Sequence, residues 1–224
     1  MEHRVQVWRG LFKPEETIHT LRESKSIHGY RWRLLILLLC SSIIFGITFY
    51  IQSAEWLLLP EAVKLDLTND QKFAASILIG IGGGLSGIIL PFLMIGSSAL
   101  LLWGFFRDIG FKRLFVMNTY LFVIILIGLA ANLPFMYAFG STEMLSPYGI
   151  GPWVKALTDH VFLTTMSGWI TIFFIWHMYS TIRLLMEASL KSKRYILCVT
   201  IGLHIILITC LSVINMMYHL HLNG

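Results

Sequence analysis

Long apolar stretches, separated by short polar segments, dominate the pattern along this chain. A helix needs about 20 consecutive apolar residues to cross the hydrocarbon core of a bilayer, and five stretches have about that length with almost no charged residue. The sequence therefore predicts an all-α, polytopic membrane bundle of five transmembrane helices, at residues 34–52, 73–106, 114–139, 161–185 and 195–218.

The second stretch is unusually long, with 34 residues and no charge. As one helix it would measure about 51 Å, against a hydrocarbon core of about 30 Å, so it forms either a hairpin or one long or bent helix with an end at the membrane surface. Basic residues collect on the cytoplasmic side of membrane proteins. A single crossing places 14 of the 17 Lys and Arg residues on one side, leaving Lys64, Lys72 and Lys155 on the other. This bias predicts a cytoplasmic N-terminus and an outside C-terminus.

Composition narrows the class of protein further. Of the 224 residues, 56% are hydrophobic and only 13% are charged, whereas soluble domains average roughly 45–50% and about 25%. We expect one transmembrane domain over residues 34–224, preceded by a leader over residues 1–33. The formal charge of +5 reflects basic residues at the ends of apolar stretches, which favours a topology signal over nucleic-acid binding.

No cofactor or metal centre is predicted. All three cysteines lie inside apolar stretches, where a thiol behaves as a small hydrophobic group: Cys40, Cys198 and Cys210. Asp159 and His160 in an outer loop could bind a transition metal together with His219 and His221 in the tail. No sequence spacing ties that loop to the tail, so these residues do not define a site.

Glycines and one proline give the second stretch a recognisable pattern. Gly80 and Gly84 stand four residues apart, as do Gly83 and Gly87, and each pair therefore lies on one helical face. Small residues at this spacing let another backbone approach closely, which is how helices associate where lipid removes the hydrophobic drive. We expect this face to pack against a neighbouring helix or a partner, and Pro91 to bend the helix.

Polar side chains inside the predicted spans are few. The middles of the spans contain no Asp, Glu, Lys or Arg, but they contain His177, His204 and Asn132. A neutral His or Asn in a span is commonly satisfied by one hydrogen bond between helices. We expect these residues to join helices, and the absence of carboxylates disfavours a proton-coupled or sodium-coupled pump.

Fragments of two intramembrane protease patterns provide an enzymatic alternative. The segment 84–87 (Gly-Leu-Ser-Gly) resembles the surroundings of the rhomboid nucleophile, with Ser86 as nucleophile and His204 as base. The other rhomboid motifs are missing, and the paired acids at 15–16 lack the arginine spacing of the CAAX-type proteases. A small-molecule transporter is the third class.

The leader combines aromatic, basic and helix-forming residues. Trp8, Arg9 and Phe12 are typical of a membrane surface, and Pro14 followed by two acidic residues is a favourable helix start. We expect a short amphipathic helix that contacts anionic lipid or a cytoplasmic partner.

Taken together, these features resemble the Yip1 domain family. The resemblance rests on Pro14 with Glu-Thr-Ile at 16–18, on five spans, on Arg107 followed by Gly-Phe-Lys-Arg-Leu-Phe at 110–115, and on Pro134. The short leader is similar to that of the bacterial members. The resemblance implies a non-catalytic integral membrane protein. Eukaryotic relatives engage trafficking GTPases, and some bacterial relatives accompany ABC exporters that protect against antimicrobial peptides.

The sequence therefore predicts a multi-pass protein of the cell membrane that works by interaction and not by catalysis. Its expected partners are membrane lipids and other membrane proteins, including subunits of an ABC-type export or protection system. No nucleic-acid partner and no cofactor are expected, and the pattern is compatible with an oligomer.

Overall fold

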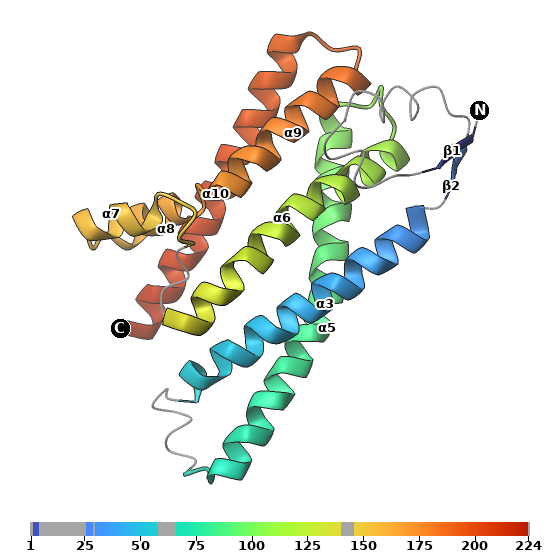
Figure 1. The fold of residues 1–224 in the computed structure, drawn as a ribbon. Helices are drawn as coiled ribbons and strands as arrows, with labels where there is room; N and C mark the ends of the chain where they lie inside the picture. The colour runs from blue at the N-terminus through green and yellow to red at the C-terminus, as the bar shows by residue number, and fades with distance from the viewer. Residues whose placement is uncertain (1, 5–25, 29, 58–65, 140–145, 224) are drawn as a thin grey trace.

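Helices form nearly all of the described structure (Figure 1). The computed structural model describes residues 2–4, 26–28, 30–57, 66–139 and 146–223. Two three-residue strands, β1 and β2, pair in parallel, and the remaining elements are helices, so the all-α prediction is confirmed for this part of the chain. The elements are β1 (Glu2–Arg4), β2 (Ser26–His28), α3 (Tyr30–Trp56), α5 (Asn69–Phe105), α6 (Phe111–Phe139), α7 (Gly151–Leu157), α8 (Val161–Gly168), α9 (Ile172–Ala188) and α10 (Lys193–Asn223).

Four of the described helices are long and apolar enough to cross a membrane: α3, α5, α6 and α10. The long second stretch forms one continuous helix, α5, with 37 residues and a length of about 55 Å. Thr68 caps its N-terminus in a reciprocal box with Gln71, in which each side chain accepts the backbone N–H of the other residue. The hairpin alternative is therefore wrong.

The prediction of a fifth continuous span at 161–185 is also wrong. Helix α8 ends at Gly168, and α9 begins only at Ile172. Between them the backbone turns to pair with the preceding segment: the Ile150 N–H donates to the Ile170 carbonyl at 3.2 Å. Thr171 then caps α9, since its hydroxyl accepts the Phe174 N–H at 3.1 Å. These bonds replace the helical ones that a continuous span would require.

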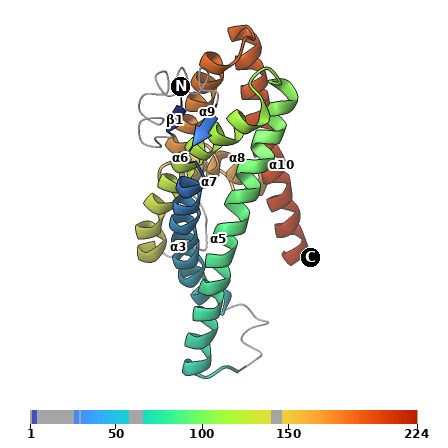
Figure 2. The same ribbon diagram turned by 90° about the vertical axis from the view of Figure 1, so that its right-hand side faces the viewer.

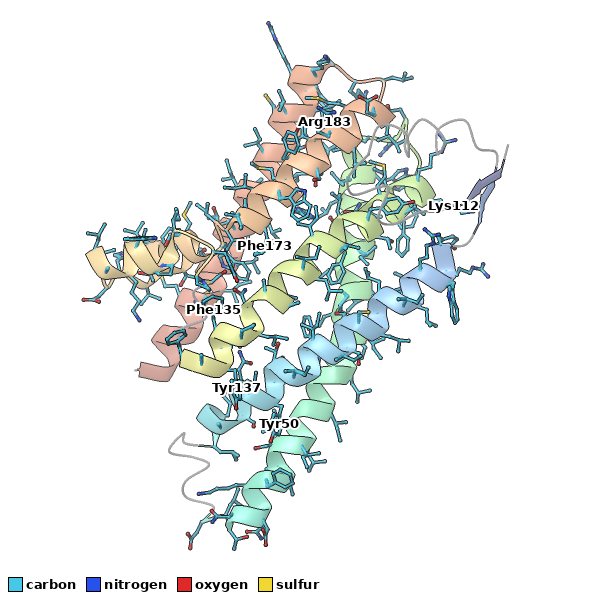
Figure 3. The ribbon with its side chains drawn as sticks, viewed as in Figure 1. Tyr50, Lys112, Phe135, Tyr137, Phe173 and Arg183 are labelled. Carbon is cyan, nitrogen blue, oxygen red and sulfur yellow. The ribbon has the colours of Figure 1, made fainter. Side chains whose placement is uncertain are left out.

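The α5–α6 and α9–α10 connections lie at the same end of the bundle (Figure 3). At one end, the Lys112 ammonium lies 5.9 Å from the ring centroid of Tyr30, and the Ser189 hydroxyl donates to Asp108. This end holds the start of α3 and the α5–α6 and α9–α10 connections. The long helices α3, α5, α6 and α10 run between the two ends, and α9 runs beside α10 to reach the α9–α10 connection (Figures 1 and 2).

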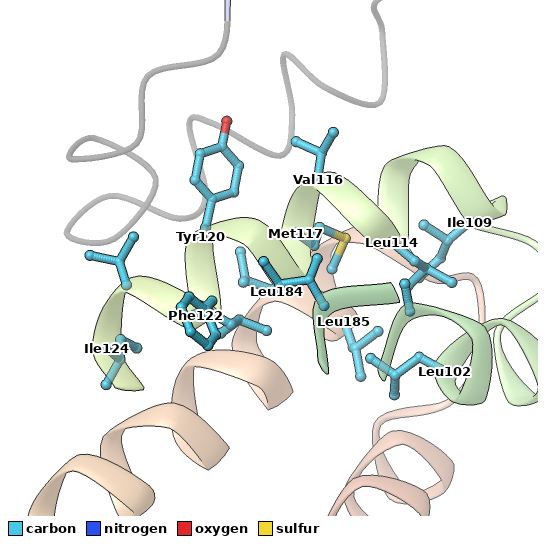
Figure 4. Packing of buried hydrophobic residues seen from close by; sticks show 14 of the residues in the cluster. Leu102, Ile109, Leu114, Val116, Met117, Tyr120, Phe122, Ile124, Leu184 and Leu185 are labelled. Atoms are coloured by element: carbon cyan, nitrogen blue, oxygen red, sulfur yellow. The ribbon is translucent and has the colours of Figure 1, made fainter. Parts of the chain in front are cut away.

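Helix α6 forms the centre of the core. It packs against α3, α5 and α9, and its side chains Leu114, Met117 and Ile124 are almost fully buried. Leu102 of α5 and Leu184 of α9 belong to the same cluster (Figure 4). Burial on several faces distinguishes α6 from the other long helices, whose apolar side chains are largely exposed.

Helices α3 and α5 approach each other closely, backbone to backbone. Gly80 and Gly84 of α5 face Gly46 of α3, and a methyl group at Gly46 would lie 3.3 Å from the Gly80 carbonyl oxygen. The Ser42 hydroxyl donates to the Gly84 carbonyl at 2.8 Å and bonds the two backbones across the contact.

Further along the same contact, a methyl group at Gly87 would lie 2.8 Å from the Ser41 carbonyl oxygen, so no side chain fits there. Pro91, one turn beyond Gly87, is buried within α5. The neighbour of the glycine face is thus another helix of the same chain.

We predict that Gly83→Ala lowers stability. A methyl group at Gly83 would lie 2.5 Å from the Cβ of Phe49, so α3 and α5 must separate at a cost of about 1–3 kcal/mol. Gly82→Ala is the matched control, because no atom lies within 4 Å of a methyl group at Gly82. The thermal unfolding midpoint of the purified protein in detergent should fall for the first variant and not for the second. Equal midpoints would contradict the close contact.

Candidate functional site: a basic rim and a buried histidine pair

Basic side chains gather at the end of the bundle that holds the start of α3 and the α5–α6 and α9–α10 connections. We call this surface the basic rim. Among the residues that the structure describes, the same region also contains Asp108 and Glu187. Lys72 in the first turn of α5 and Lys155 in α7 lie away from it. Figure 3 labels Lys112 and Arg183 at this end. The basic residues of the rim are Arg31, Arg33, Arg107, Lys112, Arg113, Arg183, Lys191, Lys193 and Arg194.

Aromatic rings lie against three of the rim cations. Arg107 lies 5.9 Å from the ring centroid of Trp103, and Lys191 lies 5.8 Å from that of Tyr195. The Lys112 ammonium lies 5.9 Å from the ring centroid of Tyr30. A cation over an aromatic face is attracted by the ring quadrupole, and Trp and Tyr favour membrane–water boundaries. The rim therefore combines positive charge with the residue types of an interfacial belt.

Asp108 connects two of the rim loops. Its carboxylate accepts the Ser189 hydroxyl and the Leu190 N–H, both at 2.7 Å. Partial burial by itself raises the pKa of Asp108. The hydrogen bonds from Leu190 and Ser189, with the nearby Lys191 ammonium, outweigh that effect, and the pKa lies below its ordinary value. The ionised carboxylate therefore holds the α5–α6 connection to the α9–α10 connection.

We predict that Asp108→Asn loosens the rim in a pH-dependent way. Because the folded-state pKa is lowered, the carboxylate contributes stability above its unfolded pKa, and this contribution is lost as pH falls through the folded pKa. The variant should therefore be less stable at pH 7 by about 1 kcal/mol, after allowing for solvent exposure, and the difference should be smaller near pH 3, below the ordinary pKa of an aspartate. Thermal unfolding at both pH values checks this, with Asp159→Asn as the control. A loss that is the same at both pH values would contradict the carboxylate clamp.

A pair of histidines joins α9 and α10. The Nε2 atom of His204 lies 3.3 Å from the Nδ1 atom of His177, and the Nδ1 atom of His204 lies 2.8 Å from the Thr200 carbonyl oxygen. A carbonyl only accepts, so in the uncharged pair His204 Nδ1 carries its hydrogen and donates it. His177 Nδ1 must then donate to His204 Nε2. The ring of Phe174 contacts His204 edge-on, with the centroids 5.5 Å apart.

This arrangement does not support the alternative dyad of Ser86 and His204. Both ring nitrogens of His204 are within hydrogen-bond distance of other groups, on Thr200 and His177. A general base must accept the proton of its nucleophile directly or through one water. In this conformation His204 has no nitrogen left to accept from Ser86, which lies on α5.

The remaining predicted residues fall in three places. Asn132 accepts the Ser146 hydroxyl at 2.9 Å and so ties α6 to the segment before α7. The glycine face and Pro91 lie in α5 as described above. The predicted leader contacts lie outside the described residues: Trp8, Arg9, Phe12 and Pro14.

Sequence reasoning missed Asp108 and the small-residue face of α3. Nothing in the local sequence links Asp108 to Ser189, because the two residues are 81 positions apart. Ser42 and Gly46 stand four residues apart, so their spacing carries the same signal that singled out the glycines of α5.

Comparisons of the chain with known protein families, with curated proteins and with solved structures find no match. The resemblance to the Yip1 domain family therefore stays a prediction from the sequence. Among the residues that the structure describes, no three His, Cys, Asp or Glu side chains gather into a group that could hold a metal ion.

Proposed function

We propose that this chain is a non-catalytic integral membrane protein of Yip1 type, which works as an accessory or assembly subunit of a membrane complex. An ABC-type export or antimicrobial-peptide protection system of the cell membrane is the proposed setting. The observation that carries this proposal is the basic rim, a charged surface assembled from three separate stretches of the chain.

The hydrogen bonds of polar side chains between the helices support the same proposal. His177 and His204 are engaged with each other between α9 and α10. Asn215 of α10 donates to Thr165 of α8 at 2.9 Å, and Ser42 bonds α3 to α5. These bonds hold the helices of the chain together, whereas the rim directs its charge outward. An outward-facing interaction surface on a bundle held by internal bonds suits an assembly subunit.

The distribution of charge gives the proposed orientation. The rim gathers nine basic residues, while Lys72 and Lys155 lie away from it. Basic residues close to span ends are retained in the cytoplasm. We therefore orient the rim toward the cytoplasm and the C-terminal end of α10 toward the outside.

We predict that the α9–α10 connection is inaccessible from outside the cell. In a chain whose three cysteines are replaced by alanine, Ser192→Cys should not react with an impermeant thiol reagent in intact cells, whereas Asp159→Cys should react. Both variants should react after the cells are permeabilised, which controls for local accessibility. Labelling of Ser192→Cys alone in intact cells would reverse the orientation.

We further predict that deleting residues 4–24 abolishes complex formation without preventing membrane insertion. The deletion removes Trp8, Phe12 and the Pro14 helix start, but it leaves Arg31 and Arg33 to mark the cytoplasmic side. Affinity purification from native membranes measures the loss of co-purified protein.

Ser86→Ala and His204→Ala are the controls for that deletion. Both should keep the complex, and His204→Ala should lose only about 1 kcal/mol of stability through the missing interhelical bond. A truncated chain that keeps its partners, together with a well-folded but inactive His204→Ala variant, would favour the enzyme alternative.

A further inference from the structure

Helices α7 and α8 lie across the long helices and not along them (Figure 1). The two short helices, with seven and eight residues, pack on each other around a polar turn at 158–160. Contacts fix this hairpin to both sides of the bundle. Thr165 of α8 accepts the Asn215 amide of α10, and Ser146, before α7, donates to Asn132 of α6.

Distances along two helices, α6 and α10, place the hairpin equally far from the basic rim. Asn215 follows Lys193, the start of α10, by 22 residues, and Asn132 follows Phe111, the start of α6, by 21 residues. At 1.5 Å per residue these separations are about 33 Å and about 32 Å. Both helices start at the basic rim, so the hairpin lies about one hydrocarbon thickness, or about 30 Å, from the rim.

The outward side of α7 is apolar, and the described part of the chain does not cover it. Trp153 is 76% exposed and Leu157 is 87% exposed. Their spacing of four residues places them on one helical face. The turn that follows exposes Asp159 and His160, so polar and apolar groups lie close together. Trp beside such a boundary is the side chain typical of a membrane interface.

The rings around Tyr148 hold the hairpin in this position. Tyr148 contacts Phe135 of α6 and Phe173 of α9, with ring centroids 5.5 and 5.4 Å apart (Figure 3). The neighbouring residue Gly149 forms a β-bridge with Thr171. The segment that leads into α7 is thus bonded to the point at which α9 begins.

We propose that α7 and α8 form an interfacial anchor, with the face of Trp153 and Leu157 buried in the lipid of the leaflet opposite the basic rim. Lipid is the occupant because the depth matches a bilayer boundary and because an exposed Trp beside exposed polar groups is typical of that boundary. The anchor sets the level at which the broken helix restarts as α9. This inference rests on the proposed membrane location.

Spin labelling tests the anchor in the full chain. Labels are placed at Trp153→Cys, Leu157→Cys, Asp159→Cys and Leu93→Cys, each in the cysteine-free background, in vesicles of phosphatidylcholine and phosphatidylglycerol. Leu93 is 57% exposed on α5 and serves as the lipid reference; Asp159 serves as the water reference. Collision rates with oxygen report lipid, and those with a water-soluble nickel chelate report water.

The anchor requires labels at 153 and 157 to give an oxygen-to-nickel ratio several-fold above that at 159. If the Trp153→Cys variant does not fold, the oxygen-to-nickel ratio at Leu157→Cys decides whether the anchor lies in lipid. Labels reached mainly by nickel, or by neither reagent because a second copy or a partner covers them, would overturn the anchor while Leu93 still reports lipid. A nickel-accessible label at Leu93 would overturn the membrane location as well.

Discussion

The close approach of α3 and α5 is the contact on which the rest of the bundle depends. Where the surroundings are as apolar as the side chains, burial gives little net gain, and helices associate through dispersion at short range and through hydrogen bonds. Glycine at 83 and 87 of α5 removes the side chains that would hold Phe49 and the Ser41 carbonyl away. The C-terminal half of α5, with the buried residues Ile95, Ala99 and Leu102, joins the core around α6. Helix α6 in turn packs against α9.

The same constraint explains how polar side chains are distributed. A polar group in an apolar environment is costly unless it is hydrogen-bonded, and several hydroxyls along the helices satisfy this requirement locally. Thr48 and Ser212, for example, each donate to the carbonyl four residues earlier at 2.8 Å. Other polar side chains bond between elements: Ser42 joins two long helices, whereas Asn132, Asn215 and the histidine pair hold the short helices and the helix that follows the break.

The two ends of the bundle differ in kind. One end is a rim of charge in which Asp108 ties two loops together. The other carries a transverse hairpin whose exposed side chains include Trp153 and Leu157. A charged end interacts with water, lipid headgroups or charged protein surfaces, whereas an apolar hairpin requires a less polar environment. In the proposed orientation, the first belongs to the cytoplasm and the second to the opposite membrane boundary.

The sequence by itself determined four of the long helices, because uninterrupted apolarity and charge at the ends are properties of local composition. It also determined the small-residue face of α5, since the spacing of Gly80 and Gly84 is a helical repeat. Only the tertiary structure decided that residues 161–185 are broken. The break itself is apolar, and it is stabilised by backbone bonds to residues 148–150 that no local pattern records. For the same reason the partners of Asp108 and His204 could not be predicted, because each bond joins segments that meet only when the chain has folded.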